Sequence, residues 1–221
     1  DIEHKKSQGS ISKDKFVNII NFIGKKNILD ADIFFEKFKT NKLKKTEVCL
    51  TFDDAIKSQI NIALPVLEDL KIKSFFFVYS AIFEGKPDYL EVFRYFRMNY
   101  FDNVNDFYDN FYKVLSIDLK KFFKDKTNEI KTKKIKFPYY SIEDIKFRLV
   151  RDLLLTKQEY EDAMFTMMKE KKFDYKKFYP KLFFSVNDLK KLDNLGHSVG
   201  LHSHNHPTLL EKLSYREQQI E

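Results

Sequence analysis

The chain has 221 residues, of which 43% are hydrophobic and 16% aromatic. This length allows one large domain or two small ones, and the apolar content excludes an intrinsically disordered chain. The 40 basic and 33 acidic residues give a formal net charge of +7. We interpret the lysine excess as scattered over a solvated surface. This argues against a nucleic-acid partner and leaves a weaker attraction to anionic glycans or phospholipids open.

Signals for membrane insertion and secretion are absent from the sequence as given. No stretch reaches the ~18 uninterrupted apolar residues of a membrane-spanning helix, so we expect no transmembrane segment. The single cysteine, Cys49, excludes an internal disulfide framework and is predicted to be a small buried hydrophobe. The first ten residues, DIEHKKSQGS, are polar and lack a signal-peptide core. The compartment stays open between cytoplasm and cell envelope.

The first 83 residues combine helical and strand patterns. Amphipathic periodicity predicts three helices, over residues 12–24, 30–38 and 55–70. Two apolar, β-rich runs are predicted to be buried strands, 47–52 and 73–80. Ser12 and Gly24 are typical start and stop residues for the first helix, and Pro65 interrupts the pattern of the third. A strand, a helix and a strand with tight connections predict a parallel βαβ unit.

From residue 84 to residue 180 the character of the sequence changes. This stretch is rich in Phe, Tyr, Lys and Asp, and it has no glycine after Gly85. Capping boxes are predicted at Ser141 with Asp144 and at Thr156 with Glu159. We interpret the stretch as a helical insertion whose aromatic side chains pack in its core. We expect it to form a lid or side wall that shapes access of a substrate.

The last forty residues return to the earlier pattern. They predict a helix over 185–196, a strand over 197–204 and the start of another helix at LSYREQQIE. The predicted organisation is therefore an α/β domain formed by residues 1–83 and 181–221, with residues 84–180 as the helical insertion.

Two adjacent acids, Asp53 and Asp54, directly follow the predicted strand 47–52. For an isolated pair of acids, capping of the helix that begins at Ala55 is the simpler interpretation. However, functional side chains collect at the carboxyl ends of parallel strands, where loops present them. A chemical role for the pair therefore depends on a second group of residues at the same edge.

A histidine cluster supplies that second group. Three of the five histidines, His202, His204 and His206, lie in GLHSHNHPTL after the last predicted strand. The spacing of His202 and His206 is common for two imidazoles on one metal ion. Two imidazoles and one carboxylate are typical of a catalytic zinc-type centre with open positions. We expect one of the two aspartates to bind the cation and the other to act as general base.

These segments resemble a known family, the polysaccharide deacetylases, also called carbohydrate esterase family 4 or the NodB-homology domain. LTFDDA is similar to the family's first motif, T-F-D-D-G, and HSHNH is similar to its second, H-[ST]-x-x-H. The flanking segments NIALPVLEDLKIKSFFFV and LKKLDNLGHSVG look like the neighbouring helices and strands of the family. The resemblance covers residues 12–83 and 181–215, roughly half of the chain.

The resemblance implies a distorted (β/α) barrel and a metal-dependent hydrolase that removes N-acetyl or other N-acyl groups from an amino sugar. It implies that Asp53 is the general base and that a divalent ion, zinc before cobalt, nickel or manganese, is bound by three residues, Asp54, His202 and His206. It implies that Ser203 supports the loop by hydrogen bonding. His204 has no counterpart in the family pattern. We expect it to face solvent, with a supporting role beside the metal as the other interpretation.

The chain departs from the family pattern in two respects. Ala55 replaces the usual glycine, which a helix start tolerates where φ is negative. The family's later motifs, which supply an arginine, an oxyanion donor, a pocket wall and a histidine acid, have no counterpart downstream of His206. We therefore expect the sequence to be a piece of a longer chain. The alternative function is a catalytically incomplete deacetylase-like module that binds a carbohydrate or protein partner.

Overall fold

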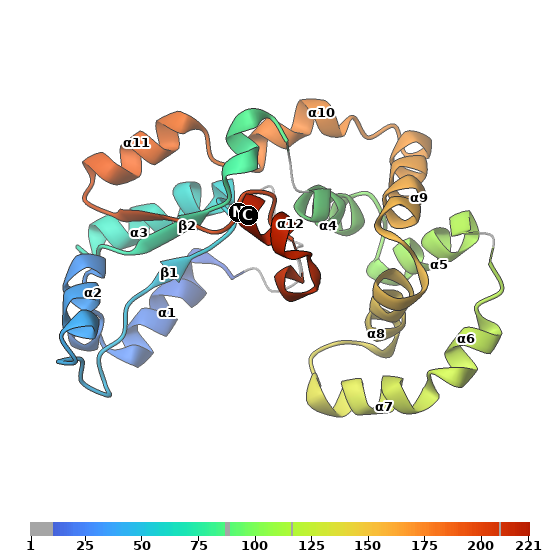
Figure 1. The fold of residues 1–221 in the computed structure, drawn as a ribbon, viewed down its shortest axis with the longest axis horizontal. Coiled ribbons are helices and arrows are strands. Elements are labelled where there is room, and N and C mark those ends of the chain that lie inside the picture. The colour runs from blue at the N-terminus through green and yellow to red at the C-terminus, as the bar shows by residue number, and fades with distance from the viewer. Residues whose placement is uncertain (1–10, 87–88, 116, 208) are drawn as a thin grey trace. The chain divides into compact units, whose positions relative to one another are not determined.

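The fold was analysed in a computed structural model that describes residues 11–221 except 87, 88, 116 and 208. The described chain forms two compact units (Figure 1). The first combines the described residues up to Val92 with Lys176–Glu221, and the second comprises Phe93–Tyr175. The structure is of the α/β class, mostly helical with one small parallel sheet. None of the described helices has the length and hydrophobicity that crossing a bilayer requires.

The sheet belongs to the first unit and has three parallel strands. They lie in the order β1 (Thr51–Phe52), β2 (Phe75–Val78) and β3 (Ser198–Leu201). The predicted parallel pairing of the first two strands is confirmed, with Phe52 opposite Phe76. β1 is shorter than the predicted run because its amino-terminal part leaves the ladder and makes an isolated bridge between Val48 and Ile28.

The described helices of the first unit lie before, between and after these strands. They are α1 (Lys13–Ile23), α2 (Ala31–Lys39), α3 (Leu64–Asp69), α11 (Val186–Asn194) and α12 (Tyr215–Ile220), with short helical turns at Lys25–Asn27, Gln59–Ala63, Ser80–Glu84, Tyr179–Lys181 and Leu210–Lys212. The predicted boundaries of the first helix are confirmed. The Ser12 side chain accepts a hydrogen bond from the Lys15 backbone N–H, and Gly24 follows the helix at φ 82°.

Phe76 lies at the centre of the aromatic core of this unit, and its side chain is fully buried. Its ring stacks on Phe52 with centroids 4.8 Å apart and meets His197 edge-on at 5.3 Å. The prediction of buried strands at 47–52 and 73–80 holds only in part, because Thr51 of β1 is exposed and β2 alternates between half-buried and buried residues. In β3, Val199 and Leu201 are 40% and 79% exposed. Within the described residues β3 is an edge strand, which explains this exposure.

Gly200 of β3 lies opposite Phe77 of β2. A Cβ atom at position 200 would lie 2.6 Å from the Phe77 ring. Only glycine therefore lets β3 approach β2 at this register without moving that ring. The close approach also positions the histidine cluster, which follows β3 directly.

The predicted helix over residues 55–70 is interrupted in the structure. Asp54 and Ala55 form a turn, and a π-helical turn at Gln59–Ala63 precedes α3. In this turn the Leu64 N–H donates to the Gln59 carbonyl, five residues back. We attribute the wider turn to Pro65, which lacks an N–H and whose ring needs space beside the preceding turn.

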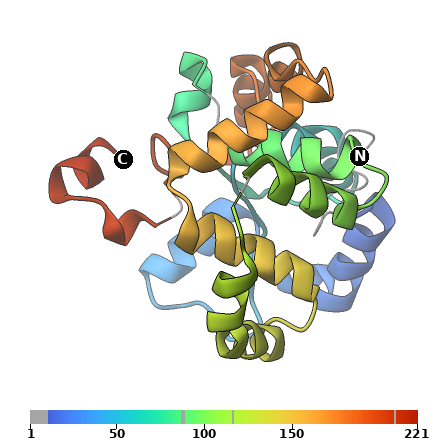
Figure 2. The same cartoon turned by 90° about the vertical axis from the view of Figure 1, so that its right-hand side faces the viewer.

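The second unit is helical, as predicted for this stretch. Figure 2 shows the helices of this unit from another side. They are the greater part of α4 (Tyr89–Asn99), α5 (Val104–Leu115), α6 (Lys120–Asp125), α7 (Thr127–Lys136), α8 (Ile142–Leu149), a π-helical turn at Val150–Leu154 and α9 (Lys157–Glu170). The short α10 (Tyr175–Phe178) begins with the last residue of this unit and continues into the first unit. The predicted packing of aromatic residues in the core is confirmed. Phe111 and Phe147 are buried, and their ring centroids are 5.1 Å apart.

The two predicted capping boxes of this unit differ in outcome. Thr156 and Glu159 form the full reciprocal box at the start of α9. At α8 only half of the box is present, because Ser141 accepts from the Asp144 N–H but the Asp144 carboxylate is used elsewhere. That carboxylate is buried and accepts hydrogen bonds from the Tyr108 hydroxyl and the Arg148 guanidinium. Burial next to an arginine overrides the local capping signal.

Candidate metal centre

Two loops at the carboxyl ends of β1 and β3 carry the residues predicted to form the site. Asp53 and Asp54 follow β1 directly, and His202 follows β3 directly. The His202 N–H donates to the Val78 carbonyl at 2.8 Å, which continues the pairing of β2 and β3 by one residue. Because the strands are parallel, both loops leave the sheet at the same edge.

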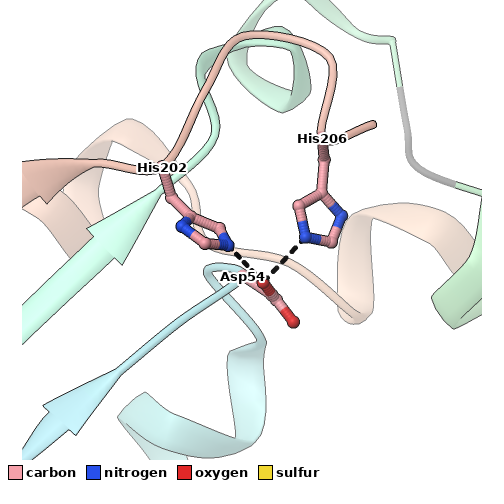
Figure 3. Close-up of side chains that lie close together, drawn as sticks. All are labelled: Asp54, His202 and His206. Carbon is pink, nitrogen blue, oxygen red and sulfur yellow. Dashed lines mark ion pairs between the residues drawn. The ribbon is translucent and has the colours of Figure 1, made fainter. Parts of the chain in front are cut away.

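Asp54, His202 and His206 converge at that edge (Figure 3). Their donor atoms all lie within 4.8 Å of one another. Asp54 Oδ1 is 3.0 Å from His206 Nε2 and 3.4 Å from His202 Nε2. The structure therefore brings together the three residues that the sequence proposed as ligands, although they come from opposite ends of the chain.

This donor set fits a divalent cation. Ligand atoms bound to one zinc ion at ~2.0–2.2 Å in a tetrahedral arrangement are about 3.3 Å apart. The two carboxylate–imidazole distances, 3.0 and 3.4 Å, lie close to that value. The side chains of Asp54, His202 and His206 are 29%, 42% and 20% exposed, which leaves the triad accessible to water or a substrate.

The backbone of both loops adopts left-handed conformations. φ is 71° at Asp54, 51° at Ala55, 68° at Ser203 and 57° at His206. Each such residue costs about 1–3 kcal/mol, and it persists only where surrounding contacts fix it. Ala55 therefore does not meet the condition of a negative φ under which a helix start tolerates alanine in place of the usual glycine. Ala55 takes the conformation that a glycine would adopt with less strain, and its side chain is fully buried.

Hydrogen bonds from two directions fix the histidine loop. The Ser203 hydroxyl accepts from the His206 N–H at 3.1 Å, which closes the turn between the two candidate histidine ligands. The Ser203 carbonyl accepts from the Ser80 N–H at 3.3 Å, and the His204 carbonyl accepts from the Ala81 N–H at 3.0 Å. The loop is therefore tied to the segment that follows β2.

The expectation that His204 faces solvent is wrong. Its side chain is half-buried, and its Nδ1 lies 2.8 Å from the Ser80 hydroxyl. The Glu221 carboxylate accepts from the backbone N–H groups of His204 and Asn205 at 3.1 and 2.7 Å. Burial alone raises the pKa of Glu221, but its hydrogen bonds with Asn205 and His204 outweigh burial and lower that pKa. The carboxylate thus stays charged and holds the loop.

Tyr79 supports His206 through ring stacking, a contact that the sequence analysis missed. The two ring centroids are 5.0 Å apart, and the planes differ by 17°. Tyr79 is buried and meets Phe183 edge-on at 6.1 Å. The available signal was its position directly after β2, because that places it at the same sheet edge as the two loops.

The loop that carries the aspartates is held by the segment before α11. The Lys57 N–H donates to the Leu182 carbonyl at 2.7 Å, and the Phe184 N–H donates to the Ala55 carbonyl at 2.9 Å. The Lys57 ammonium also forms an ion pair with Asp188 at 2.5 Å. Burial alone raises the pKa of Asp188, but its hydrogen bonds with Lys57 and with Ser185 outweigh burial and lower that pKa.

Asp53 lies beside the triad in sequence but outside its set of donor atoms. Its side chain is exposed, and its carbonyl accepts from the Gln59 side-chain amide at 2.5 Å. Gln59 belongs to the π-helical turn, so that turn also fixes the aspartate loop. An exposed carboxylate next to a candidate metal ligand is placed to exchange protons with water.

Comparisons with protein-family models, with curated proteins and with solved structures found no match for this chain. A small parallel sheet with helices supports many unrelated activities. The function is therefore inferred from the motifs and from the geometry of the site.

Proposed function

We propose that this protein is a metal-dependent hydrolase. It would remove N-acetyl or similar N-acyl groups from an amino sugar in a glycan or glycan precursor. The observation that carries the proposal is the convergence of Asp54, His202 and His206 within 4.8 Å at one edge of the sheet. The motifs LTFDDA and HSHNH, which contain these residues, support the choice of a deacetylase. The distorted (β/α) barrel of that family is part of the same proposal.

Zinc is the cation we propose for the triad, with cobalt, nickel or manganese as alternatives. Two imidazoles and one carboxylate form a borderline-soft donor set of the kind that zinc prefers. A divalent cation held there supplies Lewis acidity, which activates water and polarises a carbonyl group.

The two aspartates then have different roles. Asp54 faces both imidazoles and would act as a ligand. Asp53 accepts a proton from the water molecule that attacks the acyl carbon. A carbon–oxygen bond forms, the carbon–nitrogen bond breaks as the leaving nitrogen takes up a proton from the protonated Asp53 or from solvent, and acetate and an amine are released. The His206 ring, held by Tyr79 and by the Ser203 hydroxyl, keeps its orientation during this reaction.

A calorimetric zinc titration tests the metal site. We expect one ion per chain for the wild type and at least about hundredfold weaker binding after His206→Ala or Asp54→Ala, since each removes one of three ligands. Asp69→Asn, an exposed acid remote in sequence from both loops, is the control and should bind zinc as the wild type does. Unchanged affinity in both ligand variants would overturn the metal site.

Acetate release from an N-acetylglucosamine oligomer tests the reaction. With zinc present, we expect Asp53→Asn to lower kcat by about 10²–10⁴-fold and to leave zinc affinity unchanged, as loss of a general base does. Zinc binding by the wild type without acetate release would instead support the alternative, a catalytically incomplete module that binds a carbohydrate or protein partner.

A further inference from the structure

The positive charge of the chain is concentrated rather than scattered, contrary to our expectation. Residues 120–140 contain eight lysines and two acids, so this stretch carries +6 of the formal net charge of +7. The other two hundred residues are therefore close to neutral as a group. Such a concentration points to a specific anionic partner more than to a solvated surface in general.

Helices α6 and α7 carry this charge at one end of the helical unit (Figures 1 and 2). Ile130 of α7 is buried against Ile145 and Leu149 of α8, so the opposite face of α7 is directed outward. Within the described part of the chain, Lys126 is the one lysine of the stretch with an ion pair, to Glu129. Lys134 donates to the carbonyls of Pro138 and Tyr140, and the Lys136 ammonium lies over the Phe137 ring. The ammonium groups of the other five make no such contact in that part of the chain; they are Lys120, Lys121, Lys124, Lys131 and Lys133. Their charge is available to a partner.

Large apolar side chains protrude among these lysines. Ile135 is 83% exposed, and it lies on the outward face of α7, one helical turn after Lys131. Tyr139 and Ile142, which follow α7, are 69% and 49% exposed. The Tyr139 ring packs on Tyr140 with centroids 4.6 Å apart, so it presents a supported aromatic surface. Exposed apolar residues within a charged patch mark an interaction site.

We propose that α6, α7 and the turn up to Ile142 bind the surface of an anionic phospholipid bilayer. Lysines near such a surface are attracted by its negative potential, and apolar and aromatic side chains between them enter the boundary between headgroups and acyl chains. We name this region, residues 120–142, the basic lipid-facing surface. It lies in the helical unit, so it does not depend on the proposed function of the metal centre.

The composition favours a bilayer over a nucleic acid. Residues 120–140 contain no arginine, the residue that is best suited to bidentate phosphate recognition. An aliphatic side chain as exposed as Ile135 gains little from a phosphate backbone, but it gains free energy when it enters acyl chains.

Vesicle co-sedimentation of the full chain tests the proposal. We expect binding to vesicles of phosphatidylcholine mixed with phosphatidylglycerol, and little binding to phosphatidylcholine alone. The double variant Lys131→Gln, Lys136→Gln should weaken binding about fivefold per lysine. Ile135→Ser should weaken it about tenfold, because the side chain no longer enters the acyl region.

Two control variants match these changes elsewhere in the chain. Lys25→Gln with Lys45→Gln removes two exposed lysines of the first unit, and Phe22→Ser removes a side chain that is 93% exposed. Both should bind anionic vesicles as the wild type does. Equal loss in the control and test variants would overturn the assignment to the basic lipid-facing surface.

A fluorescent reporter separates insertion from simple charge attraction. The chain has no tryptophan, so Tyr139→Trp provides a single indole at this surface. We expect a blue shift of its emission with anionic vesicles and quenching by brominated acyl chains. Absence of both effects would overturn the proposal. So would binding to single-stranded RNA that is stronger than binding to vesicles and insensitive to Ile135→Ser.

Discussion

Ala55 adopts a backbone conformation that glycine adopts with less strain. Its φ of 51° depends on tertiary contacts, among them the hydrogen bond from the Phe184 N–H to its carbonyl. The sequence could identify Ala55 as the residue after the two acids, but it could not supply its φ. A helix that begins at Ala55 would give this residue a negative φ. In the structure the helical conformation begins only two residues later, at Lys57.

Replacing Ala55 by glycine should change the free energy of unfolding by no more than about 1 kcal/mol. Relief of the left-handed conformation is worth about 1–2 kcal/mol, and it is offset by about 0.8 kcal/mol for the buried methyl group and about 0.5–1 kcal/mol of added chain entropy. Ala55→Val should destabilise by several times as much, since a branched side chain at positive φ has no space. Urea unfolding of both variants checks this, and a loss above ~2 kcal/mol for Ala55→Gly would contradict it.

Ser203 orients the candidate ligand His206 through its backbone and is not itself one of the candidate ligands. Ser203→Ala removes the hydroxyl that accepts from the His206 N–H. We expect zinc affinity to fall about 10–100-fold, as is typical when a group that orients a ligand is removed. Calorimetric titration measures the change. Ser12→Ala removes a similar hydroxyl at the start of α1, and should leave zinc affinity unchanged. An equal effect of the two variants would mean that Ser203 has only a general structural role.

At the scale of elements, the capping signals were the most predictable features. The capping box at Thr156, which was predicted, and the one at Ser214, which was not, use only residues within one turn, so local sequence determines them. The half box at Ser141 and the π-helical turn at Gln59–Ala63 could not be predicted in the same way. The first depends on burial of Asp144 beside Arg148, and the second depends on how the chain accommodates Pro65.

Helix α11 holds the aspartate loop through Asp188. We expect Asp188→Asn to lower the free energy of unfolding by about 1–2 kcal/mol near neutral pH, since it weakens charge-assisted hydrogen bonds with Lys57 and Ser185. The pKa of Asp188 is lower in the folded state than in the unfolded chain. Its contribution is therefore complete above the unfolded pKa of about 3.9 and is lost as the pH falls through the folded value.

Urea unfolding of the wild type and Asp188→Asn at neutral and at strongly acidic pH measures this dependence. The difference between the two proteins should shrink on acidification. Asp193→Asn, an exposed acid in the same helix, is the matched control and should show almost no difference at either pH. A difference for Asp188→Asn that grows at low pH would contradict the assigned pKa direction.

At the scale of the whole molecule, the three candidate ligands belong to one of the two compact units. Asp54, His202 and His206 lie in the unit that contains the sheet, and Phe93–Tyr175 forms the other. The sequence predicted the helical character of the second unit and the meeting of the two motif loops. It could not predict the contacts of Tyr79, Gln59 and Glu221, because these depend on the packing of segments far apart in the chain.

Deletion of residues 93–175, with a short glycine–serine linker between Val92 and Lys176, tests the independence of the first unit. We expect zinc affinity within about threefold of the wild type, since all three ligands remain. Under the proposed deacetylase function, the same deletion should change the choice among N-acetylated substrates. Loss of the cooperative unfolding transition would contradict the prediction and identify the helical unit as part of a shared core.

The strand order has a consequence for how the fold responds to its surroundings. Asp54 follows β1 and both imidazoles follow β3, while β2 lies between these strands. An ion at the triad would thus join the two outer strands, which share no ladder of their own. Any ligand that binds only the folded form raises its stability by about 2.7 kcal/mol at a concentration one hundred times its Kd. Chelators would then act as mild denaturants of this sheet, and the thermal midpoint of a preparation would report its zinc content.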